Sequence, residues 1–481
     1  MVGPLGLGFG QALEKSAVYS AVPLARRSMM QTNQQKLPLS ICLGFGVGTV
    51  GVSIMLNAVT VYFPAFMSTV LGQSPEIAGY LLMASKLADA AIDVTVGSLS
   101  DRTQSRWGRR KPFLMAGALL SAISFLMLFA PPVTGQGPLI AWMIAALLIY
   151  STAYSLFNVP YMAMPAELTN GFHDRTRLLS FRTVFVSIGQ LLAMAGTAAL
   201  IKHGGSGADG FFTMGLVMAL IIGGAMTATA LAVPVQHGSI QQNQGAVSIN
   251  RHLPGVADMR SIARNRPFML LLGAKVFQFL AFASIASTGL LFMLNVLGIG
   301  YDGQIILAVT QNIVVAFSMP LWVRCGRRFG KRATYLAGVV LFCGTALSWL
   351  LADRSISTIA LVARGIMSGA GSGAILLMSV SMLGDALAYD RLLSGKAREA
   401  LLSSTIAVIE KVSFALGVAV LGAFLSLYHY VPTTGGALTA QPESALTALK
   451  MGFAVIPMVL FAINGLFLSS YDLDEKKLAG A

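Results

Sequence analysis

Apolar runs long enough to cross a lipid bilayer recur along this chain, and they constrain its fold more than any other feature. Of its 481 residues, 55% are hydrophobic and only 11% are charged, whereas soluble domains carry about 25% charged residues. A helix needs about 20 apolar residues to span a membrane. The sequence therefore predicts an all-α polytopic membrane protein with twelve spanning helices, at residues 39–66, 77–100, 112–131, 138–163, 179–201, 211–234, 267–294, 302–325, 332–351, 356–384, 399–429 and 446–470.

Basic residues are distributed unevenly over the loops between these segments. With the N-terminus inside, 25 of the 33 Lys and Arg residues fall on the cytoplasmic side, and Lys202, Arg354 and Lys450 fall outside. Such an excess orients membrane proteins, so we expect both termini in the cytoplasm. The net charge of +14 is then a topology signal that also suits contact with anionic lipid, and it does not indicate nucleic-acid binding.

The longest polar stretch divides the helices six and six. We expect a cytoplasmic N-terminal tail, two six-helix halves joined by a central cytoplasmic loop, and a short cytoplasmic C-terminal tail. A native start at Met29 or Met30, just before a polar stretch, is an alternative for the first of these. The expected ranges are 1–37 for the N-terminal tail, 38–234 for the first half, 235–266 for the central loop, 267–471 for the second half and 472–481 for the C-terminal tail.

An internal repeat relates the two halves. The segment RWGRRKPF at 106–113 aligns with RFGKRATY at 328–335, an offset of 222 residues, and both follow the second helix of their half. Parallel repeats of this kind are typical of the major facilitator fold. The same offset carries Asp89 and Asp93 onto Gln311 and Val315, so we expect an asymmetric cation site that belongs to the N-terminal half.

Three ionisable residues share one face of the second apolar segment. Lys86, Asp89 and Asp93 are spaced by three and four residues, and charges inside a membrane span usually mark an ion or substrate path. Two neighbouring carboxylates repel each other unless a proton or a cation neutralises one of them. The pattern predicts cation coupling, with Lys86 and Lys411 of the eleventh segment as counter-charges. A static ion-pair cluster is the alternative.

Other polar residues in or beside the spans are candidates for the solute site or for a gate. Pro160 frees backbone groups near Asn158 and Tyr154 in the fourth span. Three further cations lie within spans, and each could bind solute: Arg182, Lys275 and Arg364. Pairing with a neighbouring acid is the alternative for Arg182, and snorkelling or pairing is the alternative for the other two. If this basic surplus faces the cavity, an anionic solute such as a uronide would be attracted. We assign a structural gate at the cytoplasmic end to Asp101, Arg102, Arg106, Gly108, Arg109 and Arg110.

Several motifs together resemble the glycoside-pentoside-hexuronide:cation symporter family over about residues 40–470. The more specific ones are KLADAAIDVTVGSLSDRTQSRWGRRKPF at 86–113 and NVPYMAMPAELTNGFHDRTRLLSFRTVF at 158–185. Looser matches are NRPF at 265–268, LGDALAYDRLLSGKAREALL at 383–402 and VIEKVSFALG at 408–417.

The resemblance implies roles for individual residues. Asp89 and Asp93 match the paired cation-site aspartates, while Lys86 and Lys411 match basic residues near them. Ser155 stands where a family threonine helps to bind sodium. Tyr154 and Arg182 match positions that line the sugar pocket, and Asn158 is a common family choice at an aspartate position.

At several positions this chain departs from the family pattern, and these departures bear on which cation and which solute it binds. Ile92 replaces a cation-site asparagine, and it offers no oxygen to sodium, so a proton is favoured over sodium. Ser53 lies in the region of the sugar-gripping aspartate, and Met162 replaces a pocket tryptophan. Recognition of galactosides in the manner of the family is therefore not expected.

The expected function is symport of a glycoside, an oligosaccharide or a uronide with H⁺ or Na⁺, by alternating access in a bacterial cytoplasmic membrane. We expect a monomer that needs no resident metal or cofactor. No nucleophile elbow, zinc motif or phosphate loop is present in the sequence, so an enzyme is not expected. A lysolipid symporter of the same superfamily is the main alternative, and a non-transporting receptor is a third.

Overall fold

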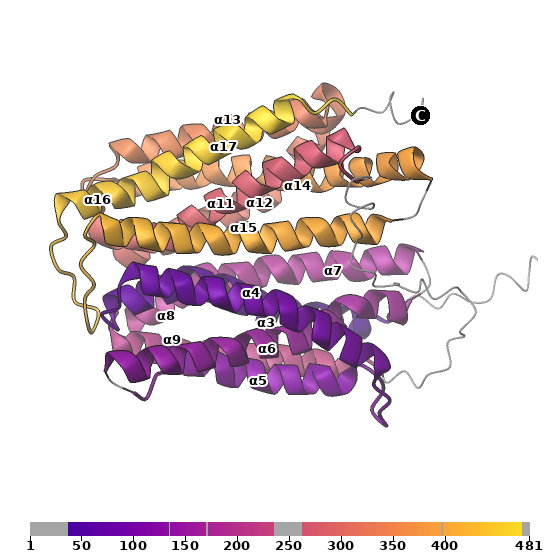
Figure 1. Ribbon diagram of the computed structural model, residues 1–481, viewed down its shortest axis with the longest axis horizontal. Helices are drawn as coiled ribbons and strands as arrows, with labels where there is room; N and C mark the ends of the chain where they lie inside the picture. The colour runs from indigo at the N-terminus through magenta and orange to yellow at the C-terminus, as the bar shows by residue number, and fades with distance from the viewer. Residues whose placement is uncertain (1–36, 134, 170–171, 235–261, 396–397, 474–481) are drawn as a thin grey trace, which may run out of the picture.

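The computed structural model describes residues 37–133, 135–169, 172–234, 262–395 and 398–473 (Figure 1). Nearly all of the expected N-terminal tail, most of the central loop and most of the C-terminal tail lie outside these residues. The described chain is helical almost throughout, as its apolar segments predict.

The first half of the chain forms six spanning helices. The fifth of them is built from α7 and α8, which a π-helical turn at Leu192–Gly196 joins without a break. The helices are α3 (Leu39–Thr69), α4 (Pro75–Arg102), α5 (Lys111–Phe129), α6 (Gln136–Leu168), α7 (Phe172–Leu191) with α8 (Thr197–His203), and α9 (Ala208–Ala232).

The second half repeats this plan with six more. Its last span is built from α16 and α17, joined by another π-helical turn at Met451–Val455. The helices are α11 (Arg266–Asn295), α12 (Gly300–Phe329), α13 (Lys331–Ser348), α14 (Thr358–Ser394), α15 (Glu399–Leu427), and α16 (Glu443–Lys450) with α17 (Ile456–Ser469).

Eleven spans of the described chain are long and apolar enough to cross a membrane on length and composition alone. The remaining long helix, α4, has 28 residues but carries Lys86, Asp89 and Asp93 in its middle. It packs against the apolar helices α6 and α15, which shield these charges from lipid. With α4 the expected twelve-helix fold is confirmed.

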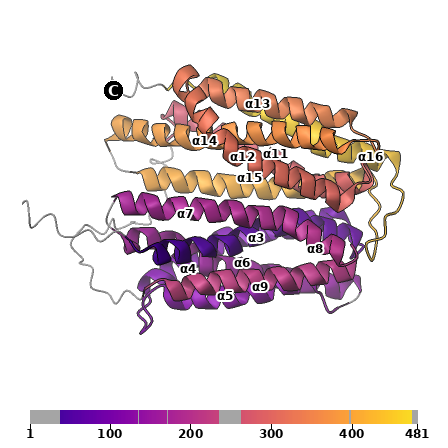
Figure 2. The ribbon, with the colours of Figure 1, turned by 180° about the vertical axis from the view of Figure 1, so that it is seen from behind.

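The two halves lie side by side as separate layers of antiparallel helices. In Figure 1 the indigo-to-magenta helices α3–α9 fill the lower half of the view, and α11–α17 fill the upper half. The view from behind shows the same division (Figure 2). An even number of crossings brings the start of α3 and the end of α17 to the same end of the bundle, which we call the terminal end. The opposite end, which holds the connection from α15 to α16, is called the loop end.

Backbone and side-chain bonds join the halves at the loop end. Leu71 and Thr434 form an isolated antiparallel bridge, and the Gly435 amide donates to the Val70 carbonyl at 2.9 Å. The start of α12 is tied to the end of α8 as well, because Lys202 Nζ lies 2.7 Å from Asp302 Oδ1. At the terminal end, the ion pairs between described residues each stay within one half.

The buried apolar residues divide in the same way. The larger cluster fills the N-terminal half and continues into the loop-end portions of the other half, where it includes Leu290, Phe292 and Phe453. A separate cluster holds together the terminal end of the C-terminal half, around Phe268 and Phe461. The halves therefore share one apolar core at the loop end and have separate cores at the terminal end.

Small residues let α4 and α15 approach closely where they cross near the loop end. A Cβ added at Gly79 would lie 2.9 Å from the carbonyl oxygen of Val418, so only glycine fits at this crossing without a shift. Glycine commonly permits such contacts between membrane helices. The close crossing brings the charged middle of α4 within reach of Lys411 on α15.

The internal repeat has a structural counterpart. Gly108 and Gly330 both adopt a left-handed backbone, with φ of 85° and 86°. Arg106 lies 5.3 Å from the Trp107 ring centroid, and Arg328 lies 5.3 Å from that of Phe329. Equal geometry 222 residues apart supports the alignment of the two halves made from the sequence.

Candidate functional site

A compact polar cluster lies in the middle of the bundle, where α4, α6 and α15 meet. Lys411 Nζ donates to Asp89 Oδ2 at 2.9 Å and to Asp93 Oδ2 at 2.6 Å. The Oγ atom of Ser155 lies 3.0 Å from Asp89 Oδ1 and 2.7 Å from Asp93 Oδ1. Each carboxylate thus contacts the same two partners, one from each half of the molecule.

The helices position this cluster through simple geometry. Asp89 and Asp93 are one turn apart on α4, so both point to the same side. Ser155 on α6 approaches from within the N-terminal half, and Lys411 on α15 approaches from the other half. Asp89 is 5% exposed, whereas Asp93 and Lys411 are 26% and 32% exposed. The cluster is therefore shielded from one side and reachable from the other.

The space beside the cluster is a cavity of about 760 Å³ between the two halves. Pockets of about 300–1,000 Å³ suit small-molecule ligands. The wall nearest the cluster carries charged and phenolic groups from α4, α6 and α15: Lys86, Asp89, Tyr154, Glu410 and Lys411.

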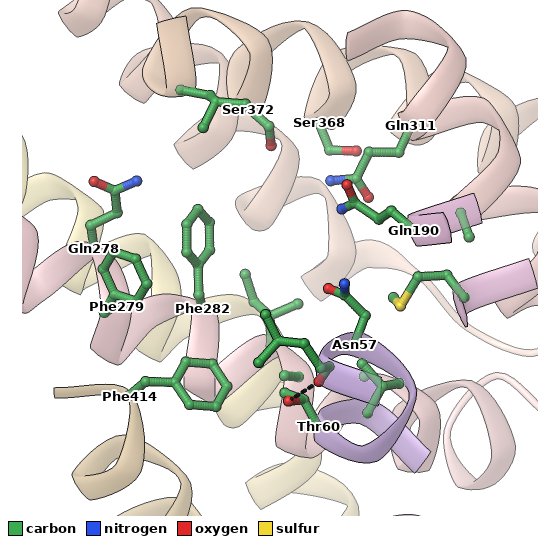
Figure 3. A pocket seen from close by; sticks show the side chains of 18 of the residues that line it. Asn57, Thr60, Gln190, Gln278, Phe279, Phe282, Gln311, Ser368, Ser372 and Phe414 are labelled. Atoms are coloured by element: carbon green, nitrogen blue, oxygen red, sulfur yellow. Dashed lines mark hydrogen bonds between the residues drawn. The ribbon is translucent and has the colours of Figure 1, made fainter. Parts of the chain in front are cut away.

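The rest of the cavity wall combines amide side chains with aromatic rings. In Figure 3, Phe279, Phe282 and Phe414 lie together on one side. Gln190, Gln311 and other polar groups lie on the other, and Thr60 is bound to the Leu56 carbonyl at 2.6 Å. Amides both donate and accept hydrogen bonds, so this lining suits a polyhydroxylated solute with an apolar face.

Some residues predicted to bind solute do not line this cavity. Tyr154 does, but Ser53, Asn158, Met162 and Arg182 are absent from its wall. Asn158 Oδ1 and Arg182 Nε are buried, with no hydrogen-bond partner among the described residues. A role for these four residues in binding solute stays a prediction.

Two further candidate cations have partners within the protein. Lys275 Nζ lies 2.9 Å from Glu410 Oε1. Arg364 donates to the Ser348 carbonyl at 2.9 Å, and its guanidinium lies 5.0 Å from the Trp349 ring centroid. Arg364 is also absent from the cavity wall. The structure thus realises the pairing alternative for Lys275, whereas the partners of Arg364 are a serine and an aromatic ring. A substrate role for either residue stays a prediction.

The predicted gate residues gather at the terminal end of the N-terminal half. Arg110 Nε lies 2.7 Å from Glu167 Oε1, and Arg110 Nη2 lies 3.1 Å from Asp101 Oδ1. Arg109 pairs with the same glutamate. Of the remaining gate residues, Arg102 ends α4 and is exposed, while Arg106 and Gly108 form the turn described above.

The C-terminal half carries a corresponding set of ion pairs. Lys331, next to the repeated glycine turn, lies 2.6 Å from Asp385 of α14. Arg398 Nε lies 2.6 Å from Asp390 Oδ2. The sequence reasoning did not assign these acids or Glu167 to the gate. These acids share one feature that the sequence does show: each stands near the terminal end of a span, at the same depth in the membrane as a turn rich in basic residues.

Sequence reasoning also missed most of the cavity wall. The sequence analysis noted Gln311 only as the repeat counterpart of Asp89, and it assigned no role to Glu410. Both line the cavity. Amides such as Asn57 and Gln190 inside apolar segments were the available signal, because uncharged polar groups within a span favour its protein-facing side.

Comparison with known proteins gives a consistent picture. A family model described as "MFS/sugar transport protein" matches residues 44–475. The isoprimeverose transporter of Lactiplantibacillus pentosus is 23% identical, over 92% of this chain and 90% of its own. The glucuronide carrier protein homolog of Escherichia coli (strain K12) is 25% identical, over 92% and 94%.

Other similarities extend beyond sugar carriers. Sodium-dependent lysophosphatidylcholine symporter 1-A of Danio rerio is 23% identical, over 96% of this chain and 91% of its own. A bacterial homologue of the human lysosomal transporter Spinster, solved in an inward-facing, unoccupied conformation, superimposes with a TM-score of 0.67 at 13% identity. That match covers 89% of this chain and 95% of the other, and it supports the fold alone.

Proposed function

The chain belongs to the MFS/sugar transport family, and from this premise we propose that it is a secondary active transporter that moves a glycoside-type solute together with a cation. It is an integral membrane transporter and not an enzyme. Alternating access would rock the two halves about the central cavity. The amide-lined wall supports a hydroxyl-rich solute, because each amide can both donate to and accept from a hydroxyl group.

One observation carries the coupling part of this proposal. Lys411 of the C-terminal half is held by Asp89 and Asp93 of the N-terminal half, at 2.9 and 2.6 Å. A cation that binds the two aspartates lowers their negative charge and weakens their hold on Lys411. Ion binding is thereby linked to a contact between the parts that must move.

Ser155 favours a proton as that cation. Its hydroxyl carries one hydrogen, so it donates to one carboxylate at a time, yet it lies within 3.0 Å of both. The second contact becomes a hydrogen bond when the other carboxyl is protonated and donates to Ser155. A sodium ion needs several oxygen ligands instead, and Ile92 supplies none.

The orientation rests on the positive-inside rule. We assign both chain ends, and hence the terminal end of the bundle, to the cytoplasm. We assign the protein, as a monomer, to a bacterial-type inner membrane. Because the halves share their bonds and core at the loop end, this conformation is closed to the outside. The terminal end is the side to which the cavity would open.

A reconstituted system tests the proposal. Proteoliposomes with an imposed pH gradient, inside alkaline, would be given radiolabelled glycosides with and without sodium. We expect uphill uptake without sodium, accompanied by alkalinisation of the outer medium. Uptake that needs sodium and moves no proton would overturn the proton assignment. The absence of uptake and of exchange for every glycoside would overturn the function.

A lysolipid symporter is the second candidate, supported by the aromatic side of the cavity and by the Danio rerio relative. The amides opposite that side favour the glycoside, since an acyl chain offers them no partner. Lysophosphatidylcholine belongs in the same uptake screen, and its transport in preference to all glycosides would favour this candidate.

A further inference from the structure

Two of the described residues that line the cavity are acidic, and they differ in what binds them. Asp89 is engaged at both oxygens, because Oδ1 contacts Ser155 and Oδ2 contacts Lys411. Glu410 pairs with Lys275 through Oε1, at 2.9 Å, and forms no hydrogen bond or ion pair with any other described residue. A carboxylate can accept about four hydrogen bonds, so Glu410 keeps the capacity to bind a ligand.

One face of α11 lies beside Glu410. Lys275, Gln278, Phe279 and Phe282 recur at helical spacing on that face, and the last three line the cavity. Gln278 is only 3% exposed, and its Oε1 has no hydrogen-bond partner among the described residues. A buried amide oxygen without a partner costs stability, so a donor group of a ligand would satisfy it.

The aromatic rings on this side of the cavity have well-defined positions. Phe279 meets Phe282 edge-on, with ring centroids 6.0 Å apart, and Phe282 meets Phe461 in the same way at 5.7 Å. Phe414 is one turn after Glu410 on α15, and Figure 3 shows it on the same side as Phe279 and Phe282. The C–H groups of a pyranose ring carry a small positive charge, so they stack on aromatic faces, which are negative.

We propose that the C-terminal half holds the sugar ring of the solute, with Glu410 accepting hydrogen bonds from its hydroxyls while Phe282 and Phe414 cover its apolar face. Gln278 adds a second acceptor. Lys275 is a positioning residue, because it holds the Glu410 carboxylate without lining the cavity itself. The inference rests on the proposed symport function and assigns the residues that recognise the solute. Most of the pocket residues expected from the sequence lie in the N-terminal half instead.

This assignment connects solute binding to cation binding. Glu410 and Lys411 are consecutive residues of α15, and they serve different ligands. Lys411 is held by Asp89 and Asp93 of the N-terminal half, whereas Glu410 faces the solute. A solute on Glu410 therefore binds the same helix that a cation on the aspartates releases.

Deoxyfluoro sugars test the acceptor role, because fluorine replaces a hydroxyl group without its hydrogen and so cannot donate. Counterflow of 4-nitrophenyl β-D-glucoside, β-D-galactoside and β-D-xyloside in proteoliposomes would show which of them exchange. Deoxyfluoro analogues of an exchanging glycoside, one for each ring hydroxyl, would then compete with it. In the wild type, at least one analogue should bind at least about tenfold more weakly than its parent.

The ratio of parent affinity to analogue affinity is measured within each variant, so it does not depend on the amount of folded protein. Glu410→Gln should reduce this ratio to less than about threefold, because an amide accepts a weaker hydrogen bond than a carboxylate. Lys275→Gln should also reduce it, whereas Lys275→Arg should retain it. Glu443→Gln is the matched control, since Glu443 is exposed and absent from the cavity wall, and it should match the wild type.

Leucine variants test the aromatic part. Phe282→Leu and Phe414→Leu keep an apolar side chain but remove the ring, so each should weaken binding of the parent glycoside by about two- to tenfold. The deoxyfluoro ratio should not change. Phe317→Leu is the control, because Phe317 is 82% exposed and absent from the cavity wall, and it should bind as the wild type does.

The outcomes separate this inference from the proposed function. Equal binding of the parent and every analogue by the wild type, or a ratio that Glu410→Gln leaves unchanged, would overturn the inference and leave symport intact. If Glu410→Gln does not exchange, Glu410→Asp, which withdraws the carboxylate by one methylene, is judged by the same ratio. Leucine variants with wild-type affinity would overturn the aromatic part. Failure of these and all other glycosides in the uptake screen to exchange would overturn the proposed function itself.

Discussion

Asp93 is the more exposed of the two aspartates that share Ser155 and Lys411, with 26% of its side chain exposed against 5% for Asp89. Asparagine keeps its shape but cannot bind a proton or present a negative charge. We expect Asp93→Asn to abolish uphill accumulation while counterflow, which needs no net cation movement, continues. Initial uptake and counterflow in the same proteoliposomes would measure both.

The control for this substitution is Asp353→Asn, which removes an acid that lies outside the spans and binds Ser355. It should accumulate solute as the wild type does. Full accumulation by the Asp93→Asn variant would remove Asp93 from the coupling site, whatever its effect on affinity.

Lys275 and Glu410 form an ion pair between α11 and α15, and their side chains are 11% and 27% exposed. Removing one partner leaves a charge in a poorly hydrated site, whereas removing both does not. We expect Lys275→Gln and Glu410→Gln each to lower thermal stability in detergent. The double variant should lose less stability than the sum of the two single losses. The coupling energy should be about 0.5–3 kcal/mol. Additive effects would show that the pair contributes no net interaction.

At the scale of helices, the crossing of α4 and α15 near the loop end depends on Gly79. A larger side chain there pushes these helices apart where they are closest, so it disfavours the conformation closed at the loop end. We expect Gly79→Leu to increase labelling of a Ser368→Cys reporter in the cavity by a membrane-impermeant maleimide from the loop-end side. The native cysteines would be replaced first.

Gly137 provides a matched control for this prediction. A Cβ added there meets nothing within 4 Å, so Gly137→Leu should leave labelling unchanged. Equal labelling of the two leucine variants would show that the crossing does not govern access to the cavity.

The helices and their pairing in two halves were predictable because hydropathy, loop charge and an offset of 222 residues all lie in the linear sequence. Asp89 and Asp93 were found because charges stand out in an apolar segment. Lys411 was named as a counter-charge for the same reason. Ser155 required resemblance, since nothing local says that a serine on another helix will meet these acids.

The rest depended on helix packing. Whether Lys275 would face the cavity or pair with Glu410 depends on the rotation of α11 against α15. The sequence leaves that rotation open, because both faces of these helices are largely apolar. The same holds for Arg182, which the resemblance implied as a pocket residue and which the structure places away from the cavity wall.

For the whole molecule, the Lys202–Asp302 pair is the ion pair between described residues that joins the halves at the loop end. Both side chains are more than half exposed, so the pair is worth roughly 0–1 kcal/mol. Asp302→Lys places two cations together and should slow transport by up to about fivefold. The double reversal, Lys202→Asp with Asp302→Lys, should restore the rate.

Raising the ionic strength should shrink both effects, because salt screens exposed charges. Initial rates of glycoside uptake at low and high salt would measure this. A double reversal that is slower than Asp302→Lys alone would mean that the two residues act through other neighbours.

Ser155 can accept a hydrogen bond from one protonated carboxyl while it donates to the other, which fits one bound proton. That number limits the solute concentration ratio that the transporter can build. If one proton crosses with each molecule of a monoanionic solute, the concentration ratio at equilibrium equals the proton ratio, about tenfold for each pH unit. When the solute is equally concentrated on both sides, the direction of net flow follows the pH difference alone. In surroundings more alkaline than the cell interior, and at equal solute concentrations, the same protein would release its solute to the outside.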